Sequence, residues 1–189
     1  MAYPFRNILT RVGVVVLLTV STTTLLAQSV SPRDWRTQLR NELPLLGHRN
    51  WIVVVDSAYP MQTSAGIETV ETNSDQLDVV RTVLDQLSKA KHVRPMIFTD
   101  AELAAVQESD AAGITAYRVA LAKILGGKET QSQRHEDIIA KLDEAGKTFR
   151  ILVLKTNLTI PYTSVFMRLD CGYWSDEQEK RLREKMAGH

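Results

Sequence analysis

The sequence predicts an α/β fold built as one domain, and two observations lead to this prediction. Short apolar runs rich in β-branched residues alternate along the chain with longer segments of helical periodicity. The chain has 189 residues, of which 44% are hydrophobic, so it is long enough for one domain with a sizeable core. We therefore expect a layered sheet with flanking helices.

The first expected element is a short amphipathic helix over residues 31–46. Its apolar residues Trp35, Leu39 and Leu43 recur at helical spacing, so one face of the helix is suited to packing on a core. Pro44 marks the end of the helix, because proline cannot continue the backbone hydrogen bonds.

The second element is a strand over Trp51–Val55. This run is unbroken and apolar, which suits a strand buried on both faces of a covered sheet. A long polar loop over 57–73 follows it and contains a short candidate strand at 67–70. A loop of this length beside the end of a strand is often functional.

The clearest helix spans residues 74–91. Four apolar residues line one face of it, namely Leu77, Val80, Leu84 and Leu87. Asn73 or Ser74 is expected to cap the helix. Asp75 and Asp78 favour its positive N-terminus.

The remaining segments continue the alternation of strands and helices. They are a strand over 93–99, helices over 100–108, 115–125 and 134–145, strands over 149–155 and 163–169, and a charged final helix. Ser175 is expected to cap the final helix. There is no internal repeat and no low-complexity linker, so we predict one folded domain over 31–189.

The composition excludes several classes of protein. The 23 basic and 22 acidic residues leave no surplus of charge for binding nucleic acid. The single cysteine, Cys171, excludes an intramolecular disulfide and argues strongly against a cysteine-based zinc site. The chain has four histidines, His48, His92, His135 and His189. Their spacing in the sequence is not that of metal ligands. The phosphate-binding, dinucleotide-binding and hydrolase motifs are also absent, so we expect neither a metal nor a cofactor.

The first 28 residues have the pattern of a cleaved signal peptide. Arg6 and Arg11 precede an apolar run over 12–26, and residues 26–29 offer a small-residue cleavage site. A membrane anchor is the alternative, but the run is short for a span of about 20 residues. We therefore predict a periplasmic or secreted protein without stable membrane association. Intact mass spectrometry of exported protein checks this, because an uncleaved chain held in the membrane would indicate an anchor.

Polar, titratable residues lie at both ends of the strand over 51–55. Open sheets commonly place their ligands at the ends of strands. His48 precedes this strand and Asp56 ends it, while Tyr162 and Ser164 lie before a later strand. Taken singly, each has an ordinary explanation, such as a solvated loop histidine or an aspartate bonded to its own turn.

Together these residues form two spaced motifs. The first is G-H-x(7)-D-x-x-x-P, which starts at Gly47 and ends at Pro60. The second is T-x(4)-P-Y-x-S, which runs from Thr156 to Ser164 and is followed by Gly172. In this order and with this spacing, the motifs resemble those of the D-ribose pyranase and L-fucose mutarotase (RbsD/FucU) family, over residues 36–174.

The resemblance implies a single RbsD/FucU-like domain and an isomerase that needs no cofactor. Members of this family interconvert the ring forms or anomers of free monosaccharides, so a ribose- or fucose-like sugar is the expected ligand. The resemblance assigns His48 to proton transfer and Asp56, Tyr162 and Ser164 to sugar binding, with His135 as the nearest match to a basic sugar contact. Ring opening needs a group that accepts and donates protons near neutral pH, as an imidazole can.

Strand geometry constrains how this site is assembled. A strand rises about 3.3 Å per residue, so His48 and Asp56 lie roughly 25 Å apart if the segment between them is extended. Either the turn at Gly47 folds back, or a neighbouring subunit completes the site. The family forms ring-like homo-oligomers with sites between subunits, so we predict a homo-oligomer with an intersubunit site.

Three departures from the family pattern leave other functions open. Ser164 stands where the family has asparagine, the loop after Asp56 is longer, and export is unusual for an enzyme of cytoplasmic sugar metabolism. The alternative function is a catalytically silent monosaccharide-binding or interaction module of the same fold. A third is an exported structural protein. His48 favours the enzyme, because binding alone does not require a titrating group there.

Overall fold

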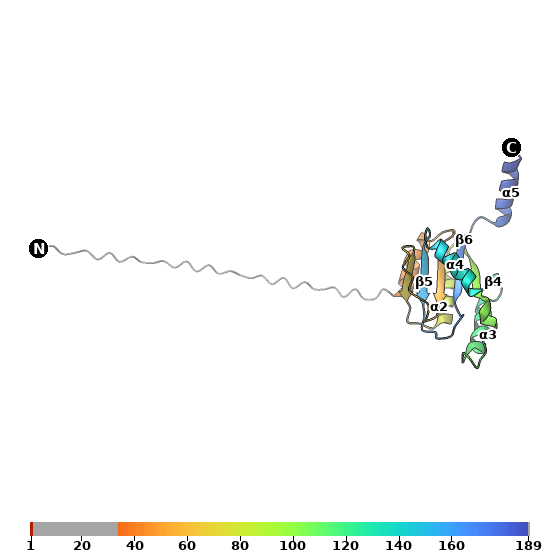
Figure 1. Ribbon diagram of the computed structural model, residues 1–189. Helices are drawn as coiled ribbons and strands as arrows, with labels where there is room; N and C mark the ends of the chain where they lie inside the picture. Colours follow the sequence, from red (N-terminus) through yellow and green to blue (C-terminus); the bar gives the residue numbers. More distant parts are fainter. Residues whose placement is uncertain (2–33, 189) are drawn as a thin grey trace. The chain divides into compact units, whose positions relative to one another are not determined.

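The computed structural model describes Met1 and residues 34–188, and residues 34–188 belong to one folded unit (Figure 1). Its strands are β1 (Trp51–Val55), β2 (Ile67–Glu71), β3 (Val93–Asp100), β4 (Thr130–Gln133), β5 (Ile151–Lys155) and β6 (Val165–Cys171). Its α-helices are α1 (Trp35–Glu42), α2 (Gln76–Lys89), α3 (Ile114–Leu125), α4 (His135–Ala145) and α5 (Asp176–Ala187). Two 3-10 helices are η1 (Leu43–Leu45) and η2 (Ala101–Ala104). Apart from Met1, the predicted signal peptide, residues 1–28, lies outside the described residues.

The six strands form one sheet in the order β2-β5-β1-β6-β3-β4. β1 pairs in parallel with β5 and antiparallel with β6, which in turn pairs antiparallel with β3. The predicted central strand is therefore confirmed, because β1 has a partner on each side and each of its five residues is 3% exposed or less. Strands β1 and β3 run in the same direction, so their C-terminal ends lie at the same edge of the sheet.

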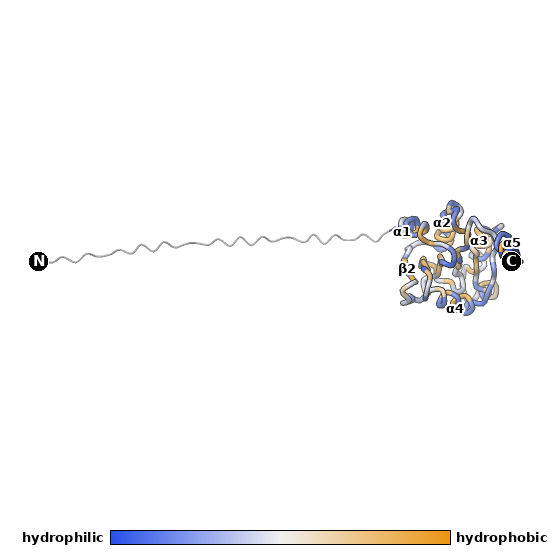
Figure 2. Tube along the Cα trace, turned by 90° about the horizontal axis from the view of Figure 1, so that it is seen from above, coloured by the Kyte–Doolittle hydropathy of each residue, from blue (hydrophilic) through white to orange (hydrophobic). Residues whose placement is uncertain are grey.

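Helices cover both faces of the sheet and produce two cores. α1, α2 and α3 lie on one face and α4 lies on the other (Figure 2). Alternate residues of β1 point to opposite faces, as expected of a strand, so Ile52 joins the core under α2 and Val53 joins the core under α4. From α4, Ile138 and Leu142 pack into this second core. The predicted α/β class with flanking helices is confirmed.

Some elements differ from the prediction for identifiable reasons. Asp75, and not Asn73 or Ser74, caps α2, because its carboxylate accepts a hydrogen bond from the backbone N–H of Asp78 at 3.1 Å. The segment 100–108 contains only the single turn η2. The strand β4 was not predicted, because its sequence TQSQ has no apolar residue, and it is an edge strand that pairs only with β3.

The final helix begins where the sequence predicts. The Ser175 hydroxyl accepts a hydrogen bond from the backbone N–H of Gln178 at 3.2 Å, and the Gln178 side chain accepts one from the backbone N–H of Ser175 at 2.7 Å. This reciprocal capping box fixes the start of α5, which has no buried residue. Within the described part of the chain, no helix combines the length and the apolar character needed to cross a membrane.

Gly172, which follows the second motif, lies so close to neighbouring backbone that a larger residue does not fit there. A Cβ at this position would lie 2.5 Å from the carbonyl oxygen of Lys91 and 2.8 Å from the backbone nitrogen of Val93. Gly172→Ala is therefore expected to lower the free energy of unfolding by about 1–3 kcal/mol, because backbone has to move. Gly47→Ala is the matched control, since a Cβ there meets nothing within 4 Å. Urea unfolding measures both variants, and equal stabilities would contradict the expected clash.

Candidate functional site

A cavity of about 390 Å³ lies at the C-terminal end of β1. Residues from three separate segments line it: the turn after β1, the start of α4 and the segment before β6. Three of the five predicted site residues meet here, namely Asp56, His135 and Tyr162. The structure therefore brings together two residues of the motifs and the histidine that the resemblance matched least well.

The local backbone explains how two of these side chains reach the cavity. The Asp56 carboxylate accepts a hydrogen bond from the backbone N–H of Ala58 at 2.8 Å, so it closes the turn that ends β1. Tyr162 follows Pro161 and has a φ of 59°, in the left-handed region that a tyrosine rarely adopts. Its ring meets the His135 ring edge-on, with the ring centres 5.6 Å apart. Strained backbone of this kind is found preferentially at functional sites.

His135 is held in place from two directions. Its backbone N–H, at the start of α4, donates a hydrogen bond to the Glu102 carboxylate at 3.0 Å. Its ring nitrogen Nδ1 lies 3.1 Å from Oδ1 of Asp100, whose side chain is completely buried. This pairing orients the imidazole and leaves its other nitrogen, Nε2, for a ligand.

Asp100 is an unusual carboxyl group, because its second oxygen, Oδ2, is buried without a hydrogen-bond partner. Burial raises the pKa of Asp100 to about 6, although the neighbouring His135 acts in the opposite direction. Asp100 was not among the predicted site residues, and it ends β3 although a helix was predicted over 100–108. The signal was available, because Asp100 ends an apolar strand just as Asp56 does, and β3 and β1 end at the same edge.

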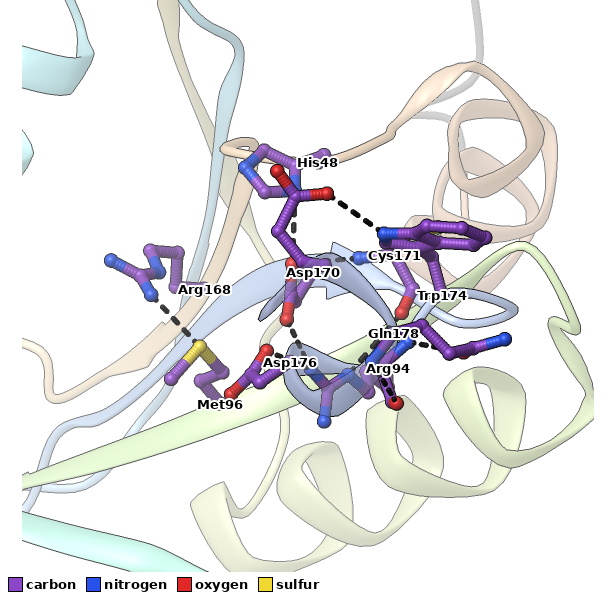
Figure 3. A network of polar contacts seen from close by, with 11 residues as sticks. His48, Arg94, Met96, Arg168, Asp170, Cys171, Trp174, Asp176 and Gln178 are labelled. Atoms are coloured by element: carbon purple, nitrogen blue, oxygen red, sulfur yellow. Dashed lines mark hydrogen bonds and ion pairs between the residues drawn. The ribbon is translucent and has the colours of Figure 1, made fainter. Parts of the chain in front are cut away.

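His48 lies at the other end of β1, in a different cavity of about 430 Å³. Its Nδ1 is 2.8 Å from Oδ1 of Asp170, and its side chain is 58% exposed (Figure 3). Arg94 also pairs with Asp170, at 2.6 Å. Although burial opposes this, the backbone N–H of Cys171 and the Arg94 guanidinium hold the pKa of Asp170 below its usual value. Asp170 is thus a second carboxylate that orients a histidine, and it was not among the predicted site residues.

Within one subunit the two cavities stay apart. α4 starts at the first cavity with His135 and ends at the second with Ala145, and 11 helical residues span about 16 Å. The turn at 47–50 does not fold back toward Asp56, because the backbone N–H of Arg49 donates a hydrogen bond to the carbonyl of Leu169 at 2.9 Å. Ser164 is 1% exposed and lines neither cavity.

The grouping of titratable side chains is a further feature of the site. In the region that the structure describes, no three side chains of the histidine, cysteine, aspartate and glutamate types are grouped to hold a metal ion. Each of the two cavities has one histidine in its lining, and each histidine is paired with an aspartate, His48 with Asp170 and His135 with Asp100. Such pairs are suited to proton transfer.

Comparison with known proteins identifies the fold. No protein-family model matches this sequence, and neither does any curated protein. Among solved structures, RbsD from Bacillus subtilis, complexed with D-ribose, is 18% identical with a TM-score of 0.50, covering 71% of this chain and 92% of its own. The fucose mutarotase from Streptococcus pneumoniae, complexed with L-fucose, is 17% identical with a TM-score of 0.48, covering 75% of this chain and 97% of its own. The chain therefore has the fold of RbsD, which confirms at the level of the fold the RbsD/FucU resemblance that the two motifs predicted.

Proposed function

We propose that the protein is an isomerase that interconverts the ring forms or the anomers of a monosaccharide. The observation that carries this proposal is the meeting of Asp56, His135 and Tyr162 in one cavity of a chain with the RbsD fold. The cavity volume of about 390 Å³ lies within the range of about 300–1,000 Å³ that small-molecule sites occupy. Because RbsD from Bacillus subtilis was solved with D-ribose, a free aldose is the proposed substrate.

The second part of the proposal is a site shared between subunits. His48 and Asp56 lie at opposite ends of β1, so one subunit cannot bring both to one sugar. In a homo-oligomer whose His48 end faces the Asp56 end of the next subunit, both would line the same space. Such a contact joins two different surfaces, and contacts of this type form a closed ring when the rotation between neighbouring subunits closes.

The two histidine–aspartate pairs can together open the sugar ring, because one histidine accepts a proton while the other donates one. One imidazole accepts the proton of the anomeric hydroxyl as a carbonyl forms at C1 and the bond from C1 to the ring oxygen breaks. The second imidazole donates a proton to that ring oxygen. Closure after rotation about the C1–C2 bond gives the other anomer, and attack by a different hydroxyl gives the other ring size. Asp56 and Tyr162 hold the sugar hydroxyls during these steps.

A catalytically silent sugar-binding module is the second candidate function. Its specific support is the placement of His48, which in one subunit is paired with Asp170 and lies away from Asp56. A subunit acting alone would then have a sugar cavity without the predicted proton-transfer group.

Exchange spectroscopy by NMR on a panel of aldoses, including D-ribose and L-fucose, tests the proposal. The mature, exported chain is expected to speed exchange between ring forms or anomers by about 10²–10⁴-fold over the spontaneous rate. Sugars that raise the thermal midpoint without any exchange would support the binding module. An absence of both binding and exchange with every aldose would contradict both functions.

A further inference from the structure

The cavity that contains His48 has an excess of positive charge. Arg49, Lys141 and Arg168 line it together with His48. The one carboxylate in its lining, Glu144, is already paired with Lys147 at 2.6 Å. The cavity therefore presents three permanent cations to whatever occupies it.

None of these three cations has a carboxylate partner in the described part of the chain. Arg49 lies over the Phe149 ring with 5.7 Å from its guanidinium to the ring centre, and Lys141 donates a hydrogen bond to the amide oxygen of Gln133. Among the other arginines that the structure describes, four lie within 3.8 Å of a carboxylate, namely Arg81, Arg94, Arg150 and Arg183, and the rest do not. What distinguishes this cavity is that three cations without a carboxylate partner line the same space.

Arg168 is the cation whose surroundings are most informative. It lies on β6 opposite Trp51 on one side and Met96 on the other, and its side chain is half-buried. Its guanidinium donates to the sulfur of Met96 at 2.8 Å, as Figure 3 shows. A thioether is a weak acceptor, so most donors of this half-buried guanidinium remain available. A guanidinium in this state is suited to binding a carboxylate or phosphate group through two parallel hydrogen bonds.

Arg49 has a backbone conformation that is unfavourable for an arginine. It has a φ of 76° in the turn that follows His48, where glycine or asparagine is the favoured residue. An arginine in the left-handed region destabilises the fold. Such strain is found preferentially at functional sites. The position keeps a cation beside His48 although a glycine would fit the backbone better.

We propose that the sugar bound at the His48 cavity carries an anionic group, a carboxylate or a phosphate, which Arg168 and Arg49 bind. This inference rests on the proposed function, because it names the substrate class of the same shared site. The anion places the sugar against the cavity floor, within reach of the His48 imidazole. Neutral aldoses of the same ring size bind more weakly, because they leave the guanidinium groups without a partner.

Calorimetric titration of the intact oligomer tests this inference with three matched probes: D-glucuronate, D-glucose 6-phosphate and D-glucose. At least one of the two anionic sugars is expected to bind about tenfold more tightly than glucose or better, with an affinity that falls as salt rises. The tighter of the two identifies the group as carboxylate or phosphate. Equal affinities for all three probes overturn the inference.

Variants connect the affinity to the named residues. Arg168→Gln is expected to reduce the affinity for the anionic sugar about tenfold or more. Arg49→Gly is expected to reduce it as well, while the thermal midpoint stays the same or rises by up to about 4 °C because the backbone strain is relieved. Arg81→Gln, which removes an exposed charge that already pairs with Asp78, is the control and should leave the affinity unchanged.

Two outcomes separate this inference from its rivals. If light scattering shows that Arg168→Gln dissociates the oligomer, the cations bind acidic groups of a neighbouring subunit, and the inference is overturned. If neutral aldoses are isomerised but anionic sugars bind no more tightly, the inference fails and the proposed function stands. If anionic sugars bind tightly through Arg168 while no sugar is isomerised, the anion site stands and the proposed enzymatic function fails.

Discussion

His48→Ala is expected to reduce the catalysed exchange of the aldose substrate by about 10²–10⁴-fold, which is the usual contribution of general acid–base catalysis. The fold should be unaffected, because the side chain is 58% exposed and belongs to neither hydrophobic core. Exchange spectroscopy by NMR measures the rate, and urea unfolding confirms that stability is unchanged. Exchange at the wild-type rate would exclude His48 as the proton-transfer residue, whatever the fold.

The same variant tests whether the site is shared between subunits. Asp56→Ala removes a group from the other cavity, and its main effect should be weaker sugar binding. If each site combines His48 of one subunit with Asp56 of the next, coexpression of the two variants restores about a quarter of the sites. Light scattering on the mature protein should give several times the mass of one subunit. A monomer, or a lack of recovery in the mixed oligomer, would contradict the shared site.

The fold was predictable from the sequence where the signal is local. The apolar run of β1 and the periodicity of α2 each depend on residues a few positions apart, and both elements form where expected. The polar strand β4 carries no such signal, because its strand geometry depends on pairing with β3, about 33 residues away in the chain. The hydrophobic pattern therefore predicts the layers of the fold and misses an edge strand.

The candidate site was predictable only in part for a similar reason. Asp56 and Tyr162 lie in spaced motifs, and the structure places both at one cavity. Asp100 and Asp170 become informative only through partners that are distant in sequence, since Asp170 is 122 residues from His48. Whether a histidine is oriented by a carboxylate is a property of sheet register, which no single stretch of sequence contains.

Asp100→Asn is expected to change how stability depends on pH. The pKa of Asp100 is raised to about 6 in the folded protein by burial, against about 3.9 in an unfolded chain. Between these values the folded state keeps a proton that the unfolded state has released, so stability falls as pH rises from about 4 to about 6. The cost is complete above pH 6 and amounts to about 3 kcal/mol. Asparagine does not titrate, so the variant lacks this cost.

Urea unfolding of both proteins at pH 4 to 7 measures this difference. Relative to wild type, the stability of Asp100→Asn should improve by about 3 kcal/mol between pH 4 and pH 7. Asp170→Asn is the control of opposite sign. Because the pKa of Asp170 is lowered, its carboxylate stabilises the fold above its unfolded pKa and this stabilisation is lost as pH falls. Parallel curves for wild type and Asp100→Asn would show that the buried carboxyl group has no such cost.

A buried carboxyl group with a raised pKa is expected to cost stability at neutral pH, and we propose that orientation of His135 is its function. Asp100→Asn should slow sugar exchange by about tenfold or more, because an amide does not hold the imidazole in one tautomer as a carboxylate does. It should also remove from the pH–rate profile the limb near pH 6 that Asp100 contributes. A variant that is more stable yet less active at pH 7 identifies Asp100 as a positioning residue. A variant that loses stability and activity together, with an unchanged pH profile, would indicate a purely structural role.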